Sequence, residues 1–421
     1  MALARRRVRG PHATGATAGV SDRSLRRDLV AAAGATTACV FPAFLTGGTG
    51  VQLREELDFG EAGLGFAVGA FFFAAALLSA VLGRLAERLG PSAALRVASV
   101  GSGVTQLVIG LAARDFGTLC VLLAIAGAWN SLAQPAANLF VARALPPERH
   151  GLAFGVKQSA IPASTLLAGL AVPSIALTAG WEWAFVLGAG LAFAGAAVVP
   201  PVAGSARRSG DKAAIPARKA ADAAAPGRVM AVLAVGVGLG AASAGSLGGF
   251  LVSAGVDTGL SEGVAALSLT AGSAVGIAVR LVSGARADRR DGGHLRVVAL
   301  MLVGGAGAYC LLAVGQPTVH VVAALLAFGT GWAWPGLFNL AVVRANPATP
   351  ARATGLTQTG TYFGAVAGPL LFGFIADRRS YAAAWLAAGV MALLAAGSML
   401  LGRLLIRRAR ATEQALPPLP A

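Results

Sequence analysis

The sequence contains few charged residues. Only 12% of its 421 residues are Asp, Glu, Lys or Arg, whereas 56% are hydrophobic. Soluble domains carry roughly 25% charged residues. A soluble core of this size cannot bury so much apolar surface, but a lipid bilayer can accept it. The composition therefore excludes an ordinary soluble domain and indicates an integral membrane protein.

Cysteine and histidine are also scarce. The three cysteines lie inside apolar runs without the spacing of a metal site or a disulfide framework: Cys39, Cys120 and Cys310. The four histidines are scattered in the N-terminal tail or near the ends of apolar runs. No nucleophile elbow or phosphate-binding loop is present, and the GxG strings do not follow a strand. We therefore expect no metal, no cofactor and no enzymatic activity.

Basic residues are in excess, with 34 Lys and Arg against 18 Asp and Glu. They occur in short segments between apolar runs and not in an aromatic-laced patch, which argues against nucleic-acid binding. When the N-terminus is placed in the cytoplasm, most basic residues fall on the cytoplasmic side and the external segments are acidic. We expect a multi-pass protein of the plasma membrane with both termini cytoplasmic. The pair Arg378 and Arg379 violates this rule.

Twelve apolar runs are long enough to cross a bilayer as helices. They are 29–50, 62–83, 96–113, 118–142, 152–178, 183–203, 229–254, 263–284, 296–315, 318–343, 353–376 and 383–403. A signal peptide is the competing interpretation of the basic N-terminus, but the run from Leu29 has the length of a full span. The sequence predicts a tail (1–28), a six-helix bundle (29–203), a linker (204–228), a second bundle (229–405) and a second tail (406–421).

The two halves of the chain repeat one another. Residues of the first half recur about two hundred positions later, exemplified by Gly155 and Gly355, by Gln158 and Gln358, and by Pro135 and Pro335. A hydrophobic chain made of two similar six-span halves is typical of secondary transporters, in which the substrate site lies between the halves.

A short motif follows the second span and returns in altered form after the eighth. The first copy is Gly83-Arg-Leu-Ala-Glu87-Arg88-Leu-Gly, and the second is Gly284-Ala-Arg-Ala-Asp288-Arg289. It resembles the signature loop of the major facilitator superfamily. This resemblance covers about residues 29–405 and implies an all-α membrane fold of two pseudo-symmetric six-helix bundles that works by alternating access.

The same motif suggests a conformational latch formed by Gly83, Glu87 and Arg88 and repeated by Gly284, Asp288 and Arg289. Glycine lets two helices touch, the carboxylate suits a helix N-terminus, and arginine pairs across the bundle interface. Breaking such a latch shifts the balance between the two facing conformations. The alternative is a topogenic loop whose charges only remain in the cytoplasm.

Polar side chains inside the spans are candidate substrate ligands. Asn130, Gln134 and Asn138 are four residues apart and share one helix face. Buried amides are costly unless they are bonded, so each needs a partner, water or a substrate. Helix–helix bonding is the structural alternative. The remaining uncharged candidates are Gln158, Gln358, Asn339, Trp129, Trp332 and Trp334, and the tryptophans can equally fill space. Pro162 is expected to kink its helix, and Pro135 and Pro335 to break theirs.

Two cations inside spans, Lys157 and Arg280, have neutral repeat mates in Thr357 and Ser79. No acidic residue lies inside a predicted span, so both cations point to an anionic substrate. Arg280 also lies four residues before Gly284, which is similar to the span-8 arginine of the monocarboxylate-transporter branch. That branch has an acidic residue one turn earlier, where this chain has Gly276. The alternative for both cations is snorkelling to the interface.

Three classes of function remain to be compared. The leading interpretation is a monomeric secondary carrier that moves a small organic or inorganic anion across the plasma membrane. The second is an efflux transporter for hydrophobic compounds, with an apolar cavity lined by Trp129, Trp332, Trp334 and Phe71–Phe73. A membrane enzyme has little support. No ATP-binding segment occurs, so gradients must drive transport.

Overall fold

The computed structural model describes residues 22–144, 155–201, 227–287, 292–346 and 350–415. In these ranges, twelve helical segments are long and apolar enough to cross a membrane. The helices of the first half are α1 (Asp22–Gly48), α2 (Gly50–Leu57), α3 (Glu61–Leu89), α4 (Pro91–Ala112), α5 (Phe116–Ala144), α7 (Ala160–Ala171), η2 (Val172–Ala176), α8 (Leu177–Ala179) and α9 (Trp181–Val198). Those of the second half are α11 (Gly227–Asp257), α12 (Glu262–Ala287), α13 (His294–Leu312), α14 (Pro317–Leu326), η3 (Ala327–Gly331), α15 (Pro335–Ala345), α16 (Pro350–Arg378) and α17 (Tyr381–Ala415).

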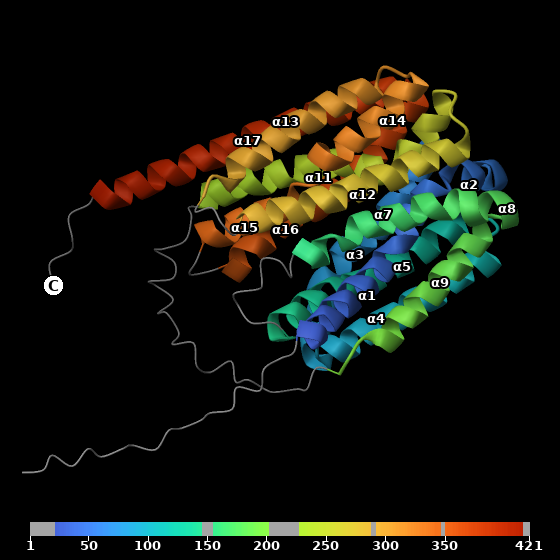
Figure 1. The fold of residues 1–421 in the computed structure, drawn as a ribbon, viewed down its shortest axis with the longest axis horizontal. Coiled ribbons are helices and arrows are strands. Elements are labelled where there is room, and N and C mark those ends of the chain that lie inside the picture. Colours follow the sequence, from blue (N-terminus) through green and yellow to red (C-terminus); the bar gives the residue numbers. More distant parts are fainter. Residues whose placement is uncertain (1–21, 145–154, 202–226, 288–291, 347–349, 416–421) are drawn as a thin grey trace, which may run out of the picture.

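The two halves form two groups of helices that meet at one end and diverge at the other (Figure 1). The meeting end, which we call the closed end, carries α2 and α8. The opposite, open end carries α15 and the end of α17 (Figure 1). The twelve-helix architecture expected from the sequence is confirmed.

Hydrophobic packing differs between these ends. At the closed end, one core contains residues of both halves, including Phe71 and Phe185 from the first and Phe250 and Trp385 from the second. Toward the open end, each half has a core of its own. The halves therefore share an interior at one end and are separate bodies at the other.

Glycines allow the closed end to pack tightly. A Cβ on Gly65 of α3 would meet the carbonyl oxygen of Pro369 and the Cα of Gly373 on α16. A Cβ on Gly169 of α7 would likewise meet the carbonyl oxygen of Ala266 on α12. Both seams join one half to the other, so small residues let the backbones touch where the halves meet.

Two membrane spans are interrupted, one in each half. In the fifth span, the helical turn that starts at Gly155 is interrupted at Ser159, and η2 is a π-helical turn beginning at Val172. In the tenth span, α14 passes through the π-helical turn η3 and restarts as α15 at Pro335. Pro135, by contrast, lies inside an uninterrupted α5. The prediction that it breaks its helix is wrong, because the surrounding turns continue without that one backbone hydrogen bond.

Several spans begin or end at other residues than the sequence predicted. Glu61 and Glu262 begin α3 and α12, and Glu61 is only 8% exposed. The expectation that no carboxylate belongs to a span is therefore wrong at the closed end. The sequence also missed α2, and α17 continues to Ala415 although its span was expected to end near residue 403. The predicted linker lies almost wholly outside the described residues.

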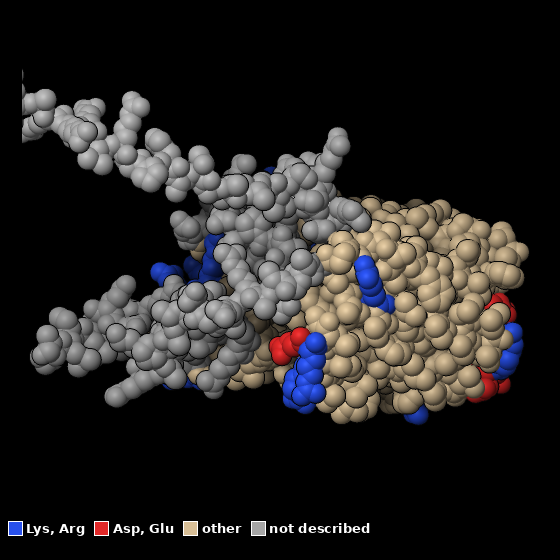
Figure 2. Space-filling view, turned by 90° about the horizontal axis from the view of Figure 1, so that it is seen from below, with Lys and Arg blue, Asp and Glu red and all other residues tan. Residues whose placement is uncertain are grey.

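Charged side chains gather mainly at the two ends of the body, and the surface between them is almost uncharged (Figure 2). Many leucines, valines and phenylalanines on this intermediate surface are exposed, including Leu77, Leu300 and Phe363. A surface of this kind suits the hydrocarbon of a bilayer. Arg378, which violates the charge rule, lies over the ring of Phe374 at 5.2 Å, a contact that stabilises an arginine beside an aromatic residue.

Candidate functional site

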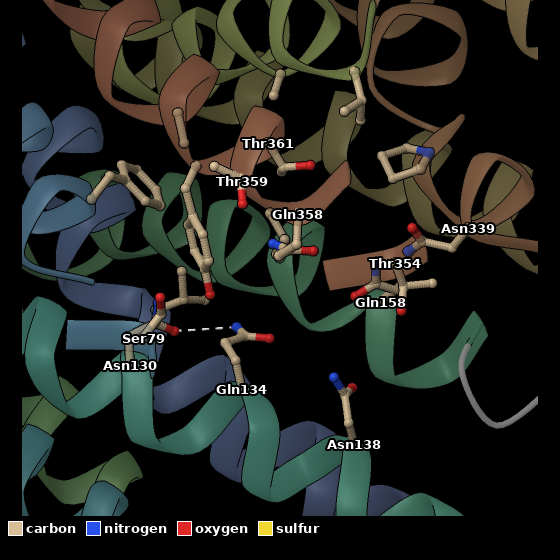
Figure 3. Close-up of a pocket in the computed structure, with 18 of the residues that line it drawn as sticks. Ser79, Asn130, Gln134, Asn138, Gln158, Asn339, Thr354, Gln358, Thr359 and Thr361 are labelled. Carbon is tan, nitrogen blue, oxygen red and sulfur yellow. Dashed lines mark hydrogen bonds between the residues drawn. The ribbon is translucent and has the colours of Figure 1, made fainter. Parts of the chain in front are cut away.

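A cavity of about 520 Å³ lies between the two halves. Its wall is contributed by α1, α3, α5 and the fifth span from the first half, and by α11, α15 and α16 from the second. Figure 3 shows amide and hydroxyl side chains from opposite halves around this space, with Gln134 and Asn138 on one side and Gln358 and Asn339 on the other. The cavity therefore occupies the interface that a transport site requires.

The predicted polar face of α5 borders the cavity. Asn130, Gln134 and Asn138 all line it, and their exposure increases from the buried Asn130 to the exposed Asn138. Gln134 Nε2 donates to Asn130 Oδ1 at 3.2 Å (Figure 3). Helical spacing of four residues placed this face correctly.

Lys157, which belongs to the fifth span, lies beside the polar face of α5 and is 6% exposed. Its Nζ donates to Gln134 Oε1 at 2.6 Å and lies 3.5 Å from Gln158 Oε1. A lysine can only donate, so Gln134 must turn its oxygen toward Lys157 and its nitrogen toward Asn130. Among the described residues that line the cavity, Lys157 is the one cation and none is acidic.

The opposite wall comes mainly from α16. Thr354, Gln358, Thr361 and Ala365 line the cavity and recur at the spacing of one helix face. Asn339 on α15 adds another amide. Gln358 and Asn339 were predicted from the sequence. The threonines were not, although their spacing indicates the same helix face.

Aromatic rings form the apolar part of the wall. Phe44, Phe72, Trp332, Trp334 and Phe338 line the cavity. Phe44 of the first half packs edge-on against Trp332 of the second, with centroids 5.5 Å apart, and against Phe72 at 6.2 Å. These rings meet across the two halves, so they bound the cavity toward the closed end.

Arg280 does not line the cavity, although it was expected to bind substrate beside Lys157. It is 5% exposed, and its guanidinium links the halves instead. Nη1 donates to the carbonyl oxygen of Gln158, and Nη2 donates to that of Trp332 at 2.5 Å. Arg280 makes no ion pair among the described residues, and its Nε has no hydrogen-bond partner. Snorkelling to the interface is excluded by these two contacts.

Both acceptors of Arg280 are carbonyl groups at helix interruptions. In a regular helix the carbonyl of Gln158 would accept from residue 162, but Pro162 has no N–H. Trp332 lies between η3 and α15, where the helix is broken. Two irregular segments, one from each half, thus offer free carbonyls to a single planar guanidinium.

The remaining predicted ligands differ in whether they line the cavity. Gln158, Trp332 and Trp334 line the cavity, whereas Trp129 does not. Trp129 packs toward α4, where its Nε1 donates to Thr105 Oγ1 at 3.1 Å. Trp129 precedes Asn130 on the helix and points about 100° away from it, toward α4. Ser79, the repeat mate of Arg280, lines the cavity and was not predicted.

The described residues include the whole first copy of the predicted latch but not all of the second copy. Glu87 and Arg88 are exposed and make no ion pair among the described residues. A Cβ at Gly83 or Gly284 would meet no atom of the described residues within 4 Å. Asp288 and Arg289 lie outside the described residues. In the described parts of the chain, no group of three or more His, Cys, Asp or Glu side chains is placed to hold a metal ion.

Comparison with solved structures finds similar folds at low sequence identity. The chain superposes on the nucleoside transporter NupG (D323A mutant) with a TM-score of 0.69 and 14% identity, over 89% of this chain and 99% of that one. It also superposes on a bacterial homolog of the human lysosomal transporter Spinster, in an inward-facing and occupied conformation. That match has a TM-score of 0.65 and 14% identity, over 94% and 100% of the two chains.

Sequence comparison gives the family. A comparison with curated proteins gave no match. The family model described as Major Facilitator Superfamily, however, matches residues 29–226 and 253–421. This match covers both halves of the repeat and agrees with the twelve membrane-spanning helices. The chain therefore belongs to the Major Facilitator Superfamily.

Proposed function

We propose that this protein is a monomeric secondary transporter that moves a small organic or inorganic anion across the plasma membrane by alternating access. The observation that carries this proposal is the charge of the cavity between the halves. Lys157 contributes one positive charge to its wall, and none of the described lining residues contributes a negative one. An unpaired charge within a membrane span is costly unless a partner compensates it.

The geometry around Lys157 supports an anion better than a cation. Lys157 Nζ donates to Gln134 Oε1 at 2.6 Å and to Gln158 Oε1 at 3.5 Å, and an ammonium has three protons to donate. A carboxylate or phosphate oxygen can take a remaining proton while Gln358, Asn339 and the threonines of α16 donate to its other oxygens. Because amides and hydroxyls both donate and accept, the same wall can orient neutral parts of the solute.

The charge distribution supports an orientation with the open end in the cytoplasm. Arg84, Arg96, Arg296 and Arg407 belong to helices near their open-end termini, whereas Glu55 lies at the closed end. Positive residues favour the cytoplasmic side. With this orientation both termini are cytoplasmic and the conformation is inward-open. We also propose that residues 29–203 and 229–405 act as the two moving bodies.

The aromatic wall favours a second candidate function, efflux of hydrophobic compounds. Phe44, Phe72, Trp332 and Phe338 provide a large apolar surface in the same cavity, and ligand sites are commonly lined by such residues. The absence of an acid among the described lining residues disfavours cationic drugs. Neutral compounds need no ionic contact with Lys157. The effect of replacing Lys157 therefore distinguishes the two candidate functions.

Thermal unfolding of the purified protein in detergent tests the proposal. A panel of small carboxylates, inorganic anions and neutral hydrophobic compounds is added at increasing concentration, because a ligand that binds only the folded state raises the midpoint. We expect an anion to stabilise the native protein and Lys157→Arg, but not Lys157→Gln. Loss of one charged hydrogen bond of about 1.5–3 kcal/mol predicts an affinity reduced by roughly 10- to 150-fold.

Two outcomes would contradict anion transport. Stabilisation by neutral hydrophobic compounds alone, equal in the native protein and Lys157→Gln, would support the exporter. Stabilisation by an anion that persists in Lys157→Gln would place the anion elsewhere. Each variant is compared first without ligand, so that a loss of folding is not mistaken for a loss of binding.

A further inference from the structure

Uncharged hydrogen-bonding side chains make up much of the wall of the cavity between the halves. Six of them are amides: Asn130, Gln134, Asn138, Gln158, Asn339 and Gln358. Each amide can donate and accept hydrogen bonds, and a polar group removed from water without a new partner is costly. A solute that enters the cavity therefore has to replace many neutral hydrogen bonds, whereas only Lys157, among the described lining residues, pairs with a negative charge.

We propose that the transported anion is a polyhydroxylated carboxylate of the sugar-acid class, with one carboxylate and several hydroxyl groups. The carboxylate rests on the anion transport proposed above, and the hydroxyl groups go beyond it. A hydroxyl donates one hydrogen bond and accepts up to two, so it can bond to either end of an amide. A solute of this class replaces the neutral hydrogen bonds of the wall, and an aliphatic carboxylate does not.

The exposure of the amides shows which of them a solute can reach. Asn130 is only 3% exposed and accepts from Gln134, whose oxygen accepts from Lys157 at 2.6 Å. Asn138 and Gln358, by contrast, are exposed although both lie within membrane spans. They line the cavity from opposite halves (Figure 3). At least one accessible amide is thus present on each wall.

The internal repeat places the charge on one half and amides on both. Gln158 and Gln358 are repeat mates, and each lines the cavity from its own half. Lys157 also lines it, but its mate Thr357 is 2% exposed and donates to carbonyl oxygens of its own helix. The complementary solute therefore has one charged end, held by the first half, and neutral polar groups that reach both halves.

The size of the cavity agrees with a solute that reaches both walls. Its volume is about 520 Å³, within the range of about 300–1,000 Å³ that is common for small-molecule sites. An inorganic anion, comparable with a few water molecules of about 30 Å³ each, would occupy a small part of it and leave one wall without contact. A hexose-derived acid has enough groups to bond to both walls at once.

The aromatic wall also suits this class of solute. Phe44 and Trp332 pack against each other across the halves, and both line the cavity. The C–H groups of a sugar acid are apolar, so they can pack on these rings by dispersion while the hydroxyl groups bond to the amides. A purely hydrophobic compound suits only the rings, because it would displace water from the amides without replacing the lost hydrogen bonds.

Thermal unfolding of the full chain in detergent, with two matched sets of solutes, tests this inference. The open-chain set is gluconate, hexanoate and sorbitol, and the ring set is glucuronate, cyclohexanecarboxylate and glucose. Each set contrasts an acid with hydroxyl groups, an acid without them, and the hydroxyl groups without the acid. We expect a sugar acid to raise the unfolding midpoint. It should bind at least about tenfold more tightly than both partners of its set, because a site that bonds hydroxyl groups rejects analogues without them.

Two substitutions separate the carboxylate from the hydroxyl groups. Gln358→Leu removes an amide from the wall at similar size, and it should weaken sugar-acid binding about tenfold without weakening that of hexanoate. Gln358→Asn keeps an amide and should restore part of the affinity. Lys157→Gln should weaken binding of the sugar acid and leave that of sorbitol unchanged. The matched control is Gln316→Leu, which removes an exposed glutamine outside the cavity wall.

The outcomes distinguish this inference from the proposed function on which it rests. If the acids without hydroxyl groups bind as tightly as the sugar acids, and Gln358→Leu has no effect, the inference is overturned and anion transport stands. If sorbitol and glucose bind as tightly as the acids, and Lys157→Gln has no effect, anion transport itself is contradicted, together with the carboxylate proposed here. A protein that none of these solutes stabilises would also overturn the inference.

Discussion

The closed and open ends of the molecule are built from the same repeated helices but are held by different interactions. At the closed end the two halves share one hydrophobic core, and glycines bring backbones of opposite halves into contact. Toward the open end each half has its own core, with a polar cavity between them. Close packing of small residues therefore joins the halves at one end, whereas a polar cavity separates them toward the other.

This difference suits the proposed alternation between two conformations. Close packing is lost abruptly when surfaces separate, because dispersion forces decline steeply with distance. The polar side chains of the cavity wall, by contrast, can bond to water or to a solute. Arg280 lies between the closely packed end and the cavity, where it joins Gln158 to Trp332. The two ends should consequently respond to different kinds of substitution.

The largest effect is expected from a side chain inserted at the closed end. In Gly65→Val, the new Cβ would meet the backbone of Pro369 and Gly373, which cannot move aside as a rotamer can. Overpacking costs about 1–3 kcal/mol, so the closed arrangement should become roughly 5- to 150-fold less favoured. The measurement is labelling of Ser253→Cys, a buried closed-end position, by a membrane-impermeant maleimide. The native cysteines Cys39, Cys120 and Cys310 are replaced beforehand.

Gly190→Val is the matched control for this experiment. Gly190 is also a helical glycine of the first half, but a Cβ there would meet nothing within 4 Å. Its labelling should equal that of the parent protein. If Gly65→Val also labels at the parent rate, the contact between α3 and α16 does not hold the closed end.

A smaller effect is expected from Arg280→Gln, which removes the bridge beside the cavity. Hydrogen bonds to charged groups contribute about 1.5–3 kcal/mol each, but removing a buried charge also relieves a desolvation cost. We therefore expect a net loss of stability near 2 kcal/mol, seen as a lower unfolding midpoint. Arg280→Lys should recover only part of it, because one ammonium cannot replace a fork that reaches two carbonyls.

The same variant separates the roles of Arg280 and Lys157. Any anion that stabilises the native protein should bind Arg280→Gln within about threefold of its native affinity, because Arg280 is outside the cavity wall. If binding is lost in Arg280→Gln and retained in Lys157→Gln, the original sequence interpretation of Arg280 as the anion ligand is restored. The comparison is made under conditions in which both variants are folded.

The sequence predicted features that follow from helical periodicity and from the internal repeat. Twelve spans and the polar face of α5 depend only on spacing, so they were predictable. The partners of Arg280 were not, because they are backbone carbonyls released at Pro162 and before Pro335. A proline can indicate that a carbonyl is free, but the sequence does not show that Arg280 lies beside it. Trp129 was misassigned for a related reason, since a single aromatic residue does not fix how its helix is rotated.

The smallest effect is expected from Glu61→Gln at the closed end. Glu61 pairs with Arg54 of its own half and lies beside Tyr381 of the other. Asp257 and Asp377 are also close enough to repel it. Neutralising Glu61 thus removes one attraction and two repulsions, and because these partly cancel, we expect a net change smaller than that of Gly65→Val. We expect Ser253→Cys labelling to change by less than fivefold, with a matching change in the parent protein when acid protonates Glu61.

Glu182→Gln provides the control that makes this small change interpretable. Glu182 lies 3.8 Å from Arg114, and their side chains are 31% and 62% exposed. Both belong to the first half, and solvent screens exposed pairs of this kind, so labelling should not change. A larger response in Glu61→Gln than in Gly65→Val would contradict the expected order of the two effects. Electrostatic pairing, and not the close approach of small residues, would then hold the closed end together.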